Sequence, residues 1–99
     1  MLKEKSSDEK LASLSKALGH PYRIKILKIL AELPPNNNCM VSNLVEELPI
    51  SQSTVSQHLK ILKKAGWIKG KVEGPSVCYC LRPEAYRDYK EMLEKLFAK

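Results

Sequence analysis

Hydrophobic residues recur along most of this chain at spacings of three and four, which is the pattern of helices with one buried face. In one stretch they alternate with polar residues, as in a half-buried β-hairpin. The predicted helices cover residues 8–18, 21–33, 42–48, 52–65 and 84–97, the predicted strands cover 67–72 and 77–81, and a short extended piece is expected at 39–41. We therefore expect a mainly α fold with a small β-hairpin, in the order α-α-α-α-β-β-α.

Residues that favour helix ends stand at several of these boundaries. Ser6 followed by Glu9 has the spacing of a capping box, and Pro21 stands where a first helical residue belongs, because its missing N–H is not needed there. Ser51 can cap the fourth helix and Gly66 can end it. These residues support the boundaries that the apolar spacing predicts.

The stretch from residue 50 to residue 66, ISQSTVSQHLKILKKAG, divides into an apolar and a polar side. Val55, Leu59 and Leu62 form one apolar stripe, and the opposite side carries uncharged polar groups and lysine. Glutamine can form two hydrogen bonds with adenine, serine can donate or accept toward several bases, and lysine favours guanine or a phosphate. On this stretch alone, a base-reading helix and an ordinary solvated helix face remain two open interpretations.

Alternation in the predicted hairpin assigns its residues to two faces. We expect one face to carry Ile68, Gly70, Val72, Val77, Tyr79 and Leu81. Cys78 and Cys80 then share the other face, with Lys69 and Lys71 alongside them.

Length and composition limit what these elements can form. We expect 99 residues to make a single domain over 1–99, with residues 1–7 as a flexible N-terminal segment. A formal charge of +6 suggests nucleic acid or a membrane surface as a partner, or serves solubility alone. The charged N-terminus does not resemble a signal sequence, and no apolar run approaches the roughly 18 residues that a bilayer span needs. We therefore expect a cytoplasmic protein without a membrane partner, and its three cysteines are expected to be reduced thiols.

Two helices joined by a turn of about three residues, the second with a polar exposed side, match the helix-turn-helix pattern, and the hairpin that follows makes the layout a winged helix-turn-helix. The chain resembles the ArsR/SmtB-type winged-helix repressors in the segments ALGHPYRIKILKIL, SQSTVSQHLKILKKAGWI and EGPSVCYCL. The resemblance implies a homodimer formed through the first and last helices, with the two fourth helices in successive major grooves of operator DNA. It also implies repression that ends when an inducer binds, often a metal ion or metalloid.

The expected DNA contacts combine the polar side of the fourth helix with a run of lysines. Gln52, Ser53, Ser56 and Gln57 are expected at base edges, and Thr54 and His58 near the DNA backbone. For His58, a structural role at the domain surface is an equal alternative. Lysines from Lys60 to Lys71 have no acidic residue between them and are expected to form one positive surface that clamps phosphates. The full predicted set is Ser51, Gln52, Ser53, Thr54, Ser56, Gln57, His58, Lys60, Lys64, Lys69 and Lys71.

The terminal helices carry more apolar surface than a small monomer readily covers. The residues expected at a dimer interface are Leu11, Leu14, Tyr86, Tyr89, Leu93 and Leu96. The alternative is that the stripe on the last helix packs back on the first helix of the same chain.

The inducer patterns of the family are missing here. The positions that match the Cys-x-Cys pair of metalloid-responsive members are Met40, Val41 and Ser42. The zinc-responsive pattern of the family uses a histidine on the last helix, and this chain has none there. The remaining candidates are Cys39, Cys78 and Cys80, because a segment before the third helix that pairs with the last wing strand would bring them together. Three thiols would suit As(III) or another thiophilic metal ion, or a redox signal. The alternative is that the cysteines serve as small neutral residues in a wing.

Other classes of function are less consistent with the sequence. We expect no enzyme, because the chain has no glycine-rich phosphate loop, no paired catalytic carboxylates and no Ser-His-Asp order. A winged-helix module that binds protein or RNA and has no inducer is the alternative to a DNA-binding repressor.

Overall fold

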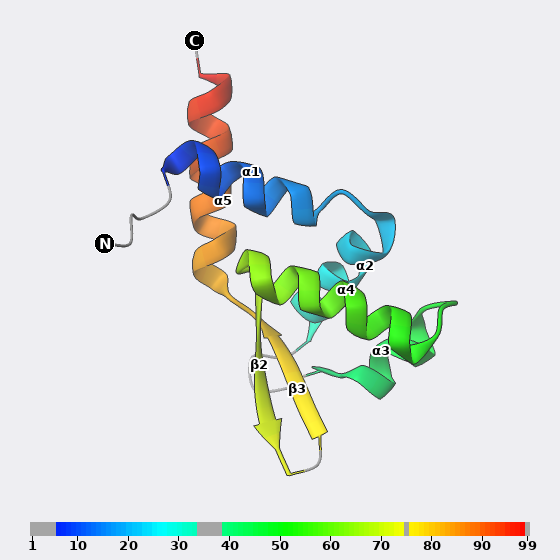
Figure 1. The fold of residues 1–99 in the computed structure, drawn as a ribbon. Coiled ribbons are helices and arrows are strands. Elements are labelled where there is room, and N and C mark those ends of the chain that lie inside the picture. Colours follow the sequence, from blue (N-terminus) through cyan, green and yellow to red (C-terminus); the bar gives the residue numbers. More distant parts are fainter. Residues whose placement is uncertain (1–5, 34–38, 75, 99) are drawn as a thin grey trace.

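The structure, a computed structural model, describes residues 6–33, 39–74 and 76–98 (Figure 1). The elements are α1 (Ser7–Ala17), α2 (Pro21–Glu32), β1 (Cys39–Met40), α3 (Val41–Glu47), α4 (Gln52–Ala65), β2 (Ile68–Glu73), β3 (Ser76–Leu81) and α5 (Pro83–Phe97). This order confirms the predicted winged helix-turn-helix, with element ends shifted by at most one residue. No helix in the described ranges is long and apolar enough to cross a membrane.

The predicted helix caps are confirmed. The Ser6 hydroxyl accepts a hydrogen bond of 3.2 Å from the Glu9 amide at the start of α1. The Ser51 hydroxyl accepts one of 3.3 Å from the Thr54 amide at the start of α4, and Gly66 ends α4 in the left-handed conformation with φ of 99°. The segment 1–7 was expected to be flexible; residues 1–5 lie outside the described ranges, whereas residues 6 and 7 form the cap and first turn of α1.

The end of α1 is held by the two amides that follow it and by two side chains from other parts of the chain. The last four carbonyls of a helix have no partner within it, so they need donors from elsewhere. The donors here are the Trp67 indole for Leu14, the Leu18 amide for Ser15, the Gly19 amide for Lys16 and the Arg23 guanidinium for Ala17. These bonds join α1 both to the start of the wing and to α2.

The hydrophobic core lies between α1, α2, α3, α4 and the base of the wing. Its most buried large side chains are Ile26, Leu44, Val55, Leu59, Leu62, Trp67 and Ile68. Trp67 is only 1% exposed, and its ring makes edge-on contacts with Tyr86 and Tyr89 of α5, with centroid distances of 5.3 and 5.1 Å. Trp67 therefore joins α5 to the core as well as to α1.

The wing has the register that the alternation predicts. β2 and β3 are antiparallel, with Ile68 opposite Leu81 and Gly70 opposite Tyr79. β1 pairs with the other edge of β3, which makes a sheet of order β1-β3-β2. Figure 1 shows the β2–β3 hairpin extending away from the helices, below α4.

Candidate nucleic-acid interface

Helix α4 follows α3 after a short turn and turns its polar side outward. Val55, Leu59 and Leu62 are fully buried, as their spacing predicts. The exposed residues of α4 are Gln52, Ser53, Ser56, Gln57, Lys60, Ile61, Lys63 and Lys64. The helix therefore presents uncharged polar side chains along its first half and lysines along its second, on a backbone fixed by the core.

The hydroxyl groups at the start of α4 contact one another. The Ser51 hydroxyl lies 2.9 Å from the Thr54 hydroxyl and 3.1 Å from the Ser53 hydroxyl, in addition to its cap bond. Thr54 is half-buried and lies on the flank of the helix, whereas Ser51 and Ser53 are exposed. Ser51 therefore organises the first turn of α4 beside the residues expected at base edges.

His58 lies in the interior, with 8% of its surface exposed. Its Nδ1 lies 3.2 Å from an Nη1 of Arg23, and its ring is tilted against that of His20 at a centroid distance of 4.5 Å. Burial lowers the pKa of His58, with smaller contributions from the charges of His20 and Arg23, so the neutral ring accepts the arginine N–H. This geometry supports the structural alternative for His58, and its position near the DNA backbone stays a prediction.

His20 is the N-cap of α2, as its place before Pro21 predicts. Its Nδ1 accepts a hydrogen bond of 3.1 Å from the Tyr22 amide. The same ring stacks on Tyr22, with centroids 5.5 Å apart. His20 therefore joins the start of α2 to the buried ring of His58.

Lys63 of α4 and the two lysines of the wing lie on different faces of β2. The ammonium of Lys63 lies 3.6 Å from the point where a Cβ on Gly70 would be, so this side chain covers the face of β2 that also carries Ile68. Lys69 and Lys71 alternate to the opposite face, where the register pairs them with Cys80 and Cys78. Lys63 therefore lies on the other face of β2 from Lys69 and Lys71, and the single positive surface expected from Lys60 to Lys71 stays a prediction.

Lys69 is also close to the first turn of α5. The pKa of Glu84 is lowered, first by a backbone hydrogen bond, then by Arg82, whose Nε lies 2.8 Å from the carboxylate, and last by the charge of Lys69. Lys63 belongs to the run of lysines that the sequence predicts to bind phosphates, and its position three residues after Lys60 places it near the same helix face. Its approach to the wing becomes visible only in the folded chain.

The thiols of the wing lie where alternation predicts. Cys78 is buried and Cys80 is half-buried, and both belong to the face that carries Lys69 and Lys71. β1 pairs with β3 as expected, with Cys39 opposite Tyr79 and Met40 opposite Cys78. Because opposite residues share a face and neighbours alternate, this register puts Cys39 on the face of Tyr79 and not on that of Cys78 and Cys80, so the prediction that the pairing gathers the three positions is wrong. The Cys39 side chain lies outside the described part of the structure, and no three metal-binding side chains gather within that part.

The residues expected at a dimer interface divide into two groups. Leu14 belongs to the core of its own chain, so its assignment to an interface is wrong. Tyr89 packs within the chain as well, with its hydroxyl 2.8 Å from that of Ser15. This contact matches the alternative in which the apolar stripe of the last helix packs on the first helix of the same chain. Leu11 and Leu93 are half-buried, Tyr86 is partly exposed and Leu96 is 60% exposed.

An ion pair of 3.1 Å between Lys10 and Asp88 also joins α1 to α5. Phe97, beyond Leu96, is 72% exposed. The first half of α5 is therefore fixed to the chain, whereas its last turns present large apolar groups to the outside.

Residues 20–69, which run from the cap of α2 to the start of the wing, match the model of the family described as bacterial regulatory protein, arsR family. The chain belongs to the ArsR family. An uncharacterized HTH-type transcriptional regulator of Methanocaldococcus jannaschii is 39% identical over 88 residues, which cover 89% of this chain and 96% of that protein. The HTH-type transcriptional repressor SmtB of Mycobacterium tuberculosis is 46% identical over 68 residues, which cover 69% of this chain and 47% of that protein.

Two further proteins extend the ArsR comparison. The cadmium resistance transcriptional regulatory protein CadC homolog of Staphylococcus aureus is 36% identical over 87 residues, which cover 88% of this chain and 67% of that protein. The solved structure of HlyU from Vibrio cholerae superimposes with a TM-score of 0.71 at 30% identity, over 97% of this chain and 100% of that chain.

The family and the fold together identify the class of function. This ArsR-family chain is a DNA-binding transcriptional regulator, and its family consists of regulators rather than enzymes. The alternative of a protein- or RNA-binding module is not favoured.

Proposed function

We propose that this ArsR-family regulator is a homodimeric repressor that reads operator DNA with α4. The observation that carries the proposal is the division of α4 into a fully buried apolar side and an exposed polar side. Because Val55, Leu59 and Leu62 fix the helix against the core, the polar side chains extend from a rigid backbone. A rigid helix with glutamine and serine on its exposed side suits direct readout in the major groove.

In this proposal, base edges and phosphates are contacted by different parts of α4. Gln52, Ser53, Ser56 and Gln57 read bases, while Ser51 and Thr54 hold the first turn near the DNA backbone. Lys60, Lys63 and Lys64 bind phosphates from the second half of the helix. Lys69 and Lys71 bind phosphates from the face of β2 opposite to the one that carries Ile68. Phosphate contacts fix the register of the protein and make its affinity fall with salt, whereas base contacts determine sequence preference.

The proposed dimer forms through α1 and α5. Tyr86, Leu96 and Phe97 are exposed, and Leu11 and Leu93 are half-buried beside them. A second copy would cover this apolar surface and place two α4 helices about one helical turn of DNA apart. Because the target is DNA, the protein is expected to act in the cytoplasm.

The proposed inducer acts on the thiols of Cys78 and Cys80. These two residues share one face of β3, whereas the register places Cys39 on the other face, and thiolates favour soft ions such as As(III), Zn²⁺ or Cd²⁺. The name of the Staphylococcus aureus relative associates it with cadmium resistance. A bound ion or an oxidised thiol at β3 would displace the wing and release the operator.

The test of the DNA proposal uses duplexes from the promoter that precedes the protein's own gene. We expect nanomolar binding, a footprint of two half-sites about one helical turn apart, and a dimer in sedimentation. A preference for RNA, no preference for any nucleic acid, or an 11.2 kDa species alone at micromolar concentration would reject the proposal.

The inducer proposal has a separate test. Arsenite, zinc, cadmium and an oxidant are added one at a time to the protein–operator complex, and to a complex of a variant with all three cysteines changed to alanine. We expect at least one addition to lower the affinity of the unchanged protein and none to affect the variant. If the affinity is unchanged in every case, the thiols are not a sensor.

A further inference from the structure

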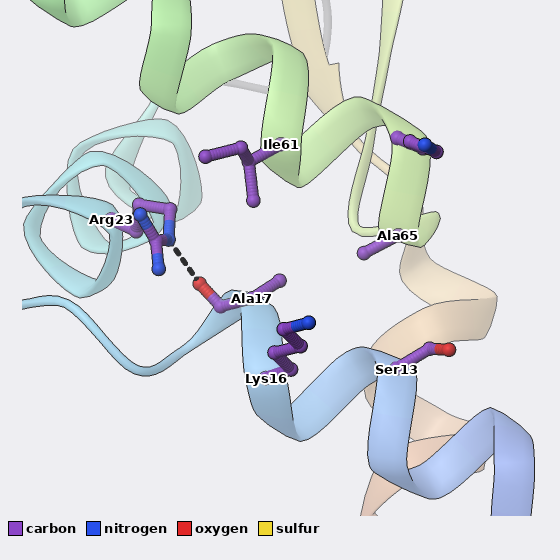
Figure 2. A pocket seen from close by; sticks show the side chains of 7 residues that line it. Ser13, Lys16, Ala17, Arg23, Ile61 and Ala65 are labelled. Atoms are coloured by element: carbon purple, nitrogen blue, oxygen red, sulfur yellow. Dashed lines mark hydrogen bonds between the residues drawn. The ribbon is translucent and has the colours of Figure 1, made fainter.

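A cavity of about 370 Å³ lies between α1, the first turn of α2 and the second half of α4. Figure 2 shows Ser13, Lys16 and Ala17 of α1 on one side, Ile61 and Ala65 of α4 on the other, and Arg23 of α2 at one end. The volume falls within the range of about 300 to 1,000 Å³ that small-molecule sites occupy.

The polar lining of the cavity is cationic. Lys16, Arg23 and Lys64 reach it from three different helices, and its lining includes no acidic residue. Arg23 is held in place because its Nε donates to the Ala17 carbonyl at 2.6 Å and an Nη1 lies 3.2 Å from His58 Nδ1. These two bonds orient the guanidinium at the edge of the cavity and leave its other N–H groups for a ligand.

Apart from Ser13, the rest of the lining is apolar. Ala17 and Ala65 provide small side chains on opposite walls, and Ile61 remains 43% exposed although it is a large hydrophobic residue. An inorganic anion would use the charges but would leave Ile61 in water. A ligand with an acidic group and an apolar body would pair with the cations and also cover Ile61.

We propose that this cavity binds a small organic anion, with a carboxylate paired to Arg23 and Lys16 and an apolar body against Ile61 and Ala65. Binding would also draw the ammonium of Lys64 toward the ligand. Because Lys64 belongs to α4, the bound anion would weaken operator binding. Only this last consequence rests on the proposed function.

The experiment measures binding without DNA. Uniformly labelled protein is titrated with 1-naphthoate and, separately, with the neutral 1-naphthamide, and amide shifts are followed by NMR. We expect naphthoate to shift the amides of Ser13, Ala17, Ile61 and Ala65, and naphthamide to bind more weakly. Lys16→Gln should raise the dissociation constant of naphthoate about fivefold, as expected for the loss of one partly exposed ion pair.

The matched control is Lys28→Gln, which removes the same charge from an exposed position of α2 outside the cavity lining. This variant should leave the dissociation constant unchanged. The proposal is overturned if naphthoate causes no shifts at millimolar concentration, if the shifts lie elsewhere, or if naphthamide binds equally well. It is also overturned if Lys28→Gln weakens binding as much as Lys16→Gln.

Discussion

Replacement of Trp67 by phenylalanine tests how the wing and α5 are held on the helical core. The Trp67 indole donates a hydrogen bond of 2.9 Å to the Leu14 carbonyl, and its ring contacts Tyr86 and Tyr89. Phenylalanine keeps an aromatic ring at this position but cannot donate, and it is smaller. The Leu14 carbonyl would therefore lose its indole donor in a buried position.

Two contributions give the expected loss of unfolding free energy in Trp67→Phe. A buried carbonyl left without its partner costs about 1–3 kcal/mol, and the unfilled volume costs about 1–2 kcal/mol more. The sum, about 2–5 kcal/mol, is a large part of the roughly 5–15 kcal/mol that stabilises a domain of this size. For such a domain each kcal/mol lowers the melting temperature by about 4–8 °C, so a fall of at least about 8 °C is expected.

The assay is denaturant unfolding followed by circular dichroism, at one fixed protein concentration because a dimer makes stability concentration-dependent. The control introduces benzothienylalanine at position 67, the only tryptophan of the chain, which keeps the shape of the ring but replaces the N–H by sulfur. This analogue should lose only the hydrogen-bond term of about 1–3 kcal/mol. If Trp67→Phe lowers the free energy of unfolding by less than about 0.5 kcal/mol, which is the usual range for surface changes, Trp67 does not hold the wing and α5 on the core.

Three further predictions concern stability. Because the pKa of His58 is lowered in the folded chain, the unfolded state binds more protons as the pH falls below about 6.5, so the urea midpoint should decrease from about pH 7.5 to about pH 5.5 and should do so less in His58→Gln. A Cβ on Gly70 would lie 3.2 Å from the Tyr79 ring and 3.3 Å from Val77, so Gly70→Ala should cost about 1–3 kcal/mol in denaturant unfolding. Gly66→Ala should cost about 1–2 kcal/mol for a different reason, because Gly66 has space around it but a φ of 99°; unchanged stability in either variant would contradict the corresponding account.

Local patterns predicted most of the fold. Ser51 and Gly66 mark the ends of α4, because capping and left-handed termination depend on the residue itself. The register of the wing also follows from alternation, because a slip by one residue would move Ile68 from the core to the outside. Helix caps and strand alternation can be predicted because they depend on residues that are close together in the sequence.

Features that depend on tertiary packing were not predicted. The periodicity of α1 placed Leu14 on an apolar face, but it did not indicate that the face packs on the core rather than on a second copy. For His58 the sequence left a structural role and a DNA contact as equal alternatives, because its contact with Arg23 of another helix depends on the fold. The cavity between α1 and α4 combines residues from three helices, so no single segment carries a pattern for it.

The central claim is that the exposed side of α4 separates base reading from phosphate binding. Gln57→Ala and Lys60→Ala change neighbouring exposed positions of this helix, and Lys28→Ala is the control for loss of charge. The decisive measurement is the affinity of each variant for operator and for random duplex over a range of salt concentrations. Gln57→Ala should lose about 1–3 kcal/mol per half-site on the operator only, with its salt dependence unchanged. Lys60→Ala should weaken both duplexes and reduce the salt slope by about 1 per subunit, whereas equal losses on both duplexes for both variants would contradict the claim.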